Sequence, residues 1–441
     1  MPDARRRIPS AAAVTAWVAW AALVVLALAA VFRDSRNIPV GRDWRIVPAV
    51  TGHESEPVHW LWYQDGNDRR PAGRALAWAV VAATRDFRAL GVVAVLGLAA
   101  LAALLLRASQ RARGARWADL FIPLVFLQPA AATGPEPSAV LMALLPLLLA
   151  GTILLAVVSD PALRTRRWSL LAALAMVTLP LTGLAGILVA AAAAPWVAAC
   201  GWRHWPPRDP GVPVDAGPAI LSFVFVAIIV TGMVFSDYDF SGWADPALDR
   251  GRLVLRAGTT LASGLGPAGV SRWGLVAGVL AGLVLLTVLM LGAAGRRVHD
   301  VERYRVLGLA CVLAGSALAV MMSAGGFAAL LLCGVFLAWG LYGWPLLTVG
   351  LQTALLAAVL IVVPTNAREV ARERRAALAP LDALVRDIAA GMPRDTVAER
   401  YRSVLLPDGE RDELAARMAM VAQAGIGPLA QLRRTPSAGA R

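Results

Sequence analysis

The chain has 441 residues, of which 58% are hydrophobic and only 16% are charged. A soluble domain carries about 25% charged residues, so the composition excludes an ordinary soluble protein and predicts an all-α polytopic membrane protein. The net charge is +13, and every basic residue is an arginine. These arginines interrupt the hydrophobic runs and form no single basic patch, so we expect no nucleic-acid partner.

Eleven apolar runs follow one another along the chain, and the longer ones reach the ~20 residues that cross a bilayer as helix. They cover residues 11–32, 89–106, 118–131, 138–158, 168–182, 184–200, 217–235, 273–293, 306–322, 326–341 and 344–363. The runs at 118–131, 168–182 and 326–341 are short for a full crossing. We therefore predict about 11 transmembrane helices, within a range of about 9 to 13.

Clusters of arginine between these runs predict the orientation through the positive-inside rule. They lie at residues 5–7, 107–116, 164–167, 203–208 and 296–305. All of them fall on one side if an even number of crossings separates each cluster from the next, and the apolar runs supply that number. We therefore expect a multi-pass protein with a cytoplasmic N-terminus.

Two long segments face the other side in this topology, residues 33–88 and residues 236–272. The first carries an amphipathic stretch at 75–83, and the second opens with SDYDF and continues into a predicted helix at 246–261. Both helices are expected to lie at the membrane interface. The spans and these extracytoplasmic loops together form a predicted transmembrane domain of residues 1–365.

Residues 366–441 have the composition of a small soluble helical tail. They carry 13 arginines against 10 acids. Gly-Met-Pro at 391–393 and Pro-Asp-Gly at 407–409 divide the tail into short helices. Eleven spans would put the tail outside, whereas its arginine content favours the cytoplasm, so the sequence leaves its side open.

Polar groups that can carry chemistry gather at residues 41–70 of the first loop. Asp43 comes about ten residues after the first apolar run and is flanked by Arg42 and Arg45. A carboxylate beside arginines can remain ionised and act as a general base. The alternative is an aspartate solvated at the interface.

Histidines, glutamates and tryptophans share this segment. His53 and His59 belong to an H-E-x-E-x-x-H sequence, which differs from the HExxH zinc pattern. Their spacing of six residues puts them on different helix faces, so we predict no metal site. Trp60 and Trp62 form either an aromatic belt at the interface or a platform for a sugar ring.

The segment ends with five polar residues that suit a charged ligand: Gln64, Asn67, Asp68, Arg69 and Arg70. Two adjacent arginines outside the membrane can bind a phosphate or diphosphate head group. The alternative is a pair of solvated charges.

Several sequence motifs resemble those of the C-type (GT-C superfamily) membrane glycosyltransferases, and more narrowly a group of largely uncharacterised bacterial polytopic membrane proteins. In that group the first loop reads D-D-W-x-L-I-P and then W-L-W-x-Q-H-N-E-H-R. Here residues 42–48 read RDWRIVP and residues 60–70 read WLWYQDGNDRR. Further matches are DLFIPLVFL, LPLTGLAGI, LAWGLYG and the tail sequence AGMPRDTVAERYRSVLLP.

The resemblance implies an enzyme of the bacterial cytoplasmic membrane that moves a sugar from a polyprenyl-phosphate donor to a glycan, lipid or protein acceptor of the cell envelope. Asp43 would be the general base, and Arg69 and Arg70, with Arg42, would stabilise the departing lipid phosphate. Trp60, Trp62, Gln64, Asn67 and Asp68 would complete the substrate site. A divalent cation is compatible with this chemistry, but one carboxylate is too few ligands to predict one.

The chain also departs from the pattern of the group. Arg42 replaces the first acid of the expected pair, N-D-R-R replaces N-E-H-R, and residues 130–134 lack the usual polar groups. These changes imply either an altered substrate or a loss of activity. The alternative functions are a non-catalytic scaffold or lipid-binding partner in envelope polysaccharide assembly, and a transporter or flippase of lipid-linked intermediates.

Overall fold

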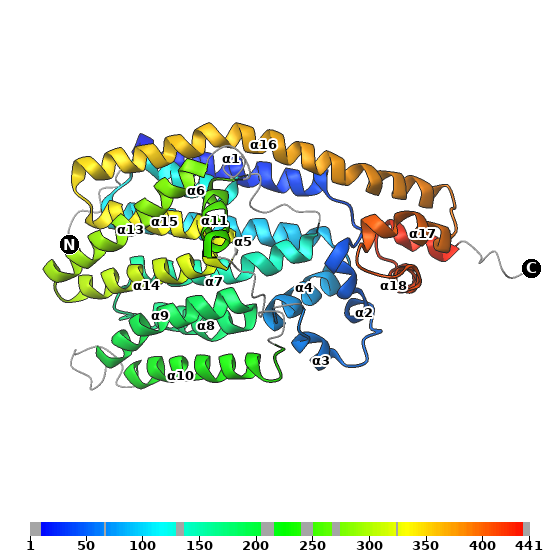
Figure 1. Ribbon diagram of the computed structural model, residues 1–441, viewed down its shortest axis with the longest axis horizontal. Helices are drawn as coiled ribbons and strands as arrows, with labels where there is room; N and C mark the ends of the chain where they lie inside the picture. The colour runs from blue at the N-terminus through cyan, green and yellow to red at the C-terminus, as the bar shows by residue number, and fades with distance from the viewer. Residues whose placement is uncertain are drawn as a thin grey trace, which may run out of the picture.

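The computed structural model describes residues 10–65, 68–128, 136–203, 216–239, 250–266, 274–322 and 325–434. Within these ranges the chain is all-α as predicted, and no strand is present beyond one isolated bridge between Asp65 and Asp68. The helices form one elongated bundle, with the short helices of the first loop and of the tail gathered at one end (Figure 1).

Seven described helices are long and apolar enough to cross a membrane, so the chain is a multi-pass membrane protein. They are α1 (Ala11–Asp34), α5 (Arg88–Arg113), α7 (Pro137–Ser159), α9 (Leu184–Arg203), α13 (Gly274–Arg297), α14 (Val301–Met321) and α16 (Pro345–Ala389). Four further helical elements lie among them: η2–α6 (Trp117–Leu120 and Phe121–Leu127), α8 (Arg166–Thr178), α10 (Ala216–Phe235) and α15 (Gly326–Tyr342). Each predicted apolar run overlaps a helix, but within the described residues only seven helices are long and apolar enough to span a membrane, fewer than the 9 to 13 predicted.

Two of the predicted spans are half-length helices. Helix α6 ends at Leu127, and all seven of its residues are buried among neighbouring helices. Helix α8 ends at Thr178 and turns through η3 (Leu179–Thr182), because Pro180 has no N–H to continue the helix and Gly183 adopts a φ of 104°. Protein surrounds α6, which is where incomplete crossings are tolerated, whereas α8 buries one face and exposes Leu170 and Leu174 on the other.

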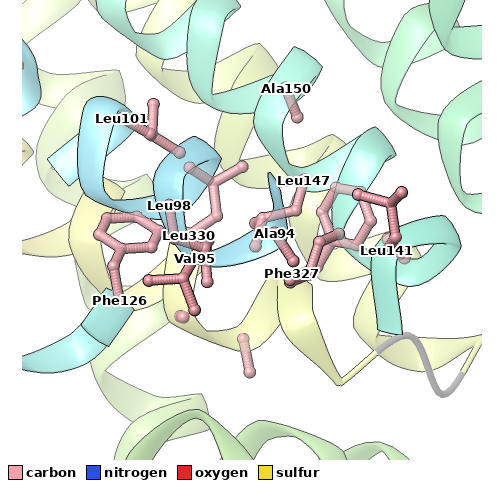
Figure 2. Close-up of a cluster of buried hydrophobic side chains, with 14 of the residues drawn as sticks. Ala94, Val95, Leu98, Leu101, Phe126, Leu141, Leu147, Ala150, Phe327 and Leu330 are labelled. Atoms are coloured by element: carbon pink, nitrogen blue, oxygen red, sulfur yellow. The ribbon is translucent and has the colours of Figure 1, made fainter. Parts of the chain in front are cut away.

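Close packing of α5 against α7 forms the centre of the bundle. Figure 2 shows this core, in which Ala94 and Leu98 of α5 meet Leu147 of α7 and Phe327 of α15. A Cβ atom at Gly151 of α7 would lie 2.5 Å from Leu101 Cδ2 of α5. Small residues let membrane helices approach in this way and increase their dispersion contacts.

The first loop folds into short helices at one end of the bundle. They are η1 (Gly41–Arg45), α2 (Val47–Val50), α3 (Pro57–Trp62) and α4 (Pro71–Thr84), and α4 contains the predicted amphipathic stretch. In the second long loop α11 (Arg250–Ala262) and η5 (Ser263–Leu265) are described, while residues 246–249 of the predicted helix lie outside the described residues. Helix α11 runs across the direction of the bundle (Figure 1) and contacts α13 and α14.

The tail lies at the same end of the bundle as the first loop (Figure 1). Helix α16 continues without a break across residue 365 and leads into α17 (Arg394–Leu405), α18 (Arg411–Gln423) and η6 (Pro428–Arg434). Arg374 pairs with Asp34 at 2.8 Å, and Asp382 pairs with Arg36 at 2.8 Å. These ion pairs fasten α16 to the end of α1, so the first loop and the tail share one side of the membrane.

We predict that Gly151→Leu lowers the thermal midpoint of the purified protein by several degrees. The added side chain has no space against Leu101, and overpacking a core costs about 1–3 kcal/mol. Gly350→Leu is the matched control, because Gly350 is also helical and a Cβ there meets nothing within 4 Å. Equal midpoints for the two variants would contradict the close α5–α7 contact.

Candidate functional site

A polar cavity of about 440 Å³ opens at the first-loop end of the bundle. We call it the arginine-rich cavity. Its walls come from η1, α3, α4, the start of α7 and the tail helix α18. Its charged lining residues are Arg42, Arg45, Arg70, Arg74, Arg417, Glu54, Asp65, Asp68 and Glu413. The cavity therefore joins the predicted loop site to a part of the chain more than 300 residues away.

A second cavity, of about 690 Å³, lies between α1, α5, α6, α7, α15 and α16. We call it the apolar cavity. Charged side chains line only the end near the first loop: Asp34, Arg36, Arg88, Glu373 and Arg374. Farther in, the lining includes Leu98, which follows Arg88 by ten residues, or about 15 Å of helix. The cavity is thus a deep apolar chamber with a charged rim.

Asp43 lies in the layer of protein that separates the two cavities, which we call the Asp43 wall. Its Oδ1 accepts a hydrogen bond from Ser138 N at 3.0 Å, and its Oδ2 accepts one from Val40 N at 3.3 Å. Val40 lines the apolar cavity, whereas Ser138 lines the arginine-rich cavity. The Asp43 side chain itself is 0% exposed and lines neither cavity. It therefore joins the first loop to the start of α7 as a buried link.

The pKa of Asp43 is raised to about 7, chiefly by burial and to a smaller extent by the charge of Glu136, whereas hydrogen bonds from Ser138 and Val40 oppose the shift. A carboxyl group with this pKa changes its charge near neutral pH. In this conformation the buried Asp43 has no access to a substrate.

The arginines of the polar cavity are held in place by nearby acceptors. Arg45 pairs with Asp65, and Arg70 pairs with Asp68 at 2.6 Å. Arg74 donates to the carbonyl oxygens of Trp60, at 2.9 Å, and Tyr63, and so fixes the end of α3. Arg42 is exposed and makes no hydrogen bond or ion pair with the described part of the chain.

The neighbouring residues Arg69 and Arg70 point to different places. Arg69 is 9% exposed and donates to the carbonyl oxygens of Val234, at 3.1 Å, and Ser236, at 2.7 Å. It closes the end of α10 and does not line the arginine-rich cavity. Of the three arginines predicted to bind the phosphate, Arg42 and Arg70 line this cavity and Arg69 does not.

Asp68 connects this region to the turn before α9. Its Oδ1 accepts from Leu184 N at 3.1 Å, and a Cβ at Gly183 would overlap the carboxylate. Because Gly183 has a positive φ and no room for a side chain, glycine is required there. The LPLTGLAGI sequence thus supports Asp68, which in turn orients Arg70.

The remaining predicted residues are divided between the cavity and the loop scaffold. Trp60 lines the arginine-rich cavity, and its Nε1 donates to Arg45 O at 3.0 Å. Trp62 lies on the outer surface beside it. Gln64 exchanges hydrogen bonds of 2.8 and 2.9 Å with the backbone of Asp239 and so ties the two long loops together. Asn67 lies outside the described residues.

Sequence reasoning missed five residues of this region: Arg74, Glu136, Ser138, Glu413 and Arg417. Arg74 had a detectable signal, since it directly precedes the predicted amphipathic stretch at 75–83 and follows Arg70 by four residues. The other four are distant in sequence from the loop, and no local pattern indicates their position. Among the described residues no group of three or more His, Cys, Asp or Glu side chains comes together as a metal site.

We predict that the free energy of unfolding of the wild-type protein falls, relative to that of the Asp43→Asn variant, as the pH rises from 4.5 to 7. The native pKa of about 7 lies above the ordinary value of 3.8, so the native state holds the proton more tightly than the unfolded state. Its stabilising contribution is complete below pH ~4 and disappears by pH ~7, with a slope of at most about 1.4 kcal/mol per pH unit. Thermal midpoints of the two proteins in detergent measure the difference, and a difference independent of pH would contradict a buried, protonated Asp43.

No protein-family model, curated protein or solved structure matches this chain. The geometry of the two cavities and of the Asp43 wall therefore carries the functional argument.

Proposed function

We propose that this protein transfers a sugar from a polyprenyl-phosphate donor to a cell-envelope acceptor, on the outer side of the bacterial cytoplasmic membrane. The observation that carries the proposal is that a deep apolar cavity and an arginine-rich one lie on opposite sides of the segment that Asp43 holds. A prenyl-phosphate sugar has two parts that match these cavities. Its prenyl chain is apolar, and its head group is anionic and polar. Arginine is well suited to bind the phosphate.

The lipid must pass the Asp43 wall to occupy both cavities. In the proposal it separates the segment around Val40 from the start of α7 and breaks the hydrogen bond between Asp43 and Ser138 N. The freed carboxylate then faces the substrate, and the loss of burial lowers its pKa, so that it is ionised at neutral pH and can accept a proton. Substrate binding thereby exposes the Asp43 carboxylate, which can then act as a base.

The proposed reaction is a displacement at the anomeric carbon of the donor sugar. An acceptor hydroxyl oxygen bonds to this carbon, while its proton passes to the Asp43 carboxylate. The bond from the carbon to the phosphate oxygen breaks, and the polyprenyl phosphate leaves with the electron pair. Arg42 and Arg70 stabilise its charge, and Trp60 supports the sugar ring.

A non-catalytic lipid-phosphate binding protein is the second candidate. The observation that favours it is the burial of Asp43, whose two oxygens accept hydrogen bonds from backbone N–H groups. In this case Asp43 only holds the wall, and the cavities present a lipid to an envelope assembly.

Asp43→Asn separates the two candidates. The glycosyltransferase proposal predicts a loss of sugar transfer of about 10²- to 10⁴-fold, because a general base is removed. The assay follows a labelled sugar from polyprenyl-phosphate donors into envelope fractions. Asp395→Asn, on the exposed face of α17, is the control for the substitution itself. Full transfer by a folded Asp43→Asn variant would remove Asp43 from the chemistry.

The side of the membrane has its own test. Alkaline phosphatase needs disulfide bonds that form outside the cytoplasm, so we predict that a fusion at the C-terminus is active. A fusion at residue 165, between α7 and α8, should be inactive because that connection lies at the arginine-clustered end. The reverse pattern would place the cavities on the cytoplasmic side.

A further inference from the structure

The C-terminal tail supplies part of the wall of the arginine-rich cavity. Glu413 and Arg417 lie one turn apart on α18, and both line the cavity with Arg42 and Arg45 of the first loop. The side chain of Arg417 is only 20% exposed. In a tail that only followed the last span, an arginine would be expected to lie exposed. The position of Arg417 therefore indicates that the tail contributes to the cavity.

The tail is fixed in position by its own core and by its contacts with the first loop. Leu414, Met418 and Val421 of α18 are all 0% exposed. Arg85 donates to Ala424 O at 3.3 Å. Gly427 has a φ of 56°, and a Cβ there would overlap the carbonyl oxygen of Asn37, so only glycine fits. These contacts hold α18 against the cavity.

The charges around Arg417 favour an anion. Arg417 pairs with Glu413 at 2.6 Å, and Arg45 pairs with Asp65. Burial lowers the pKa of Arg417, Glu413 opposes the shift, and the positive charge of Arg45 lowers the pKa further. The two guanidinium groups therefore repel each other across the cavity. Each has five N–H donors, of which one carboxylate uses at most two.

We propose that Arg417 binds the phosphate of the lipid head group together with Arg42 and Arg45, so that the tail completes the substrate site. The proposal rests on the proposed function, because it takes the ligand of the cavity to be a lipid phosphate. Two or more guanidinium groups converging on one phosphate bind it by charge-assisted hydrogen bonds. Glu413 competes with the phosphate for Arg417 and limits its affinity.

Isothermal titration of the full-length protein in detergent with farnesyl phosphate tests this proposal. Arg417→Ala should raise the Kd at least tenfold. Arg411→Ala should leave it unchanged, because Arg411 lies on the same helix, is 51% exposed and does not line the cavity. Glu413→Gln should lower the Kd several-fold, since it frees Arg417. A merely structural pair would instead give weaker binding in both Arg417→Ala and Glu413→Gln.

Farnesol and inorganic phosphate distinguish the sources of affinity. Farnesol, which lacks the phosphate, should bind weakly and equally to all variants. If wild-type protein binds farnesol as tightly as farnesyl phosphate, both the proposed function and the role of Arg417 are overturned. If farnesyl phosphate binds more tightly but Arg417→Ala does not weaken it, only the role of the tail is overturned. If inorganic phosphate binds as tightly as farnesyl phosphate, the cavity is an anion site, and the proposal that its ligand is a lipid phosphate is overturned.

Discussion

The hydrogen bonds from Val40 N and Ser138 N to Asp43 hold the functional end of this protein together. They cross 95 residues of sequence at the Ser138 contact and join the first loop to the start of α7. The wall they form separates an apolar chamber from an arginine-rich one. Because the Asp43 pKa lies near 7, the link is made by a group that can change its charge at neutral pH without a large cost.

The scaffold around this wall brings distant segments to one end of the bundle. Helix α16 runs from the bundle into the tail, and ion pairs to Asp34 and Arg36 hold it beside α1. The tail therefore reaches the first loop as a rigid extension of a span. Arg69 and Gln64 similarly anchor the first loop to the end of α10 and to the second long loop. Rigid elements thus position a site that is itself made of loops.

The length of the apolar runs predicted where the helices lie, because it is a local feature of the sequence. It also marked the runs at 118–131 and 168–182 as short for a full crossing, and the structure has the short helices α6 and α8 there. The crowding of polar residues in the first loop predicted a site with Arg42 and Arg70, and both line the arginine-rich cavity. Local sequence could not show that Arg69 points to α10, since adjacent residues on a loop have no fixed relation. The position of Arg417 in the cavity could not be predicted from local sequence, because it depends on how the whole chain folds.

A structure with bound undecaprenyl phosphate tests most directly whether the two cavities form one lipid site. We expect the prenyl chain to lie along Leu98 and Leu147, the phosphate to lie within hydrogen-bond distance of Arg42 or Arg417, and the contact between Asp43 and Ser138 N to be open. A lipid bound on the outer face of the bundle, with the Asp43 wall closed and the arginine-rich cavity empty, would contradict a shared lipid site.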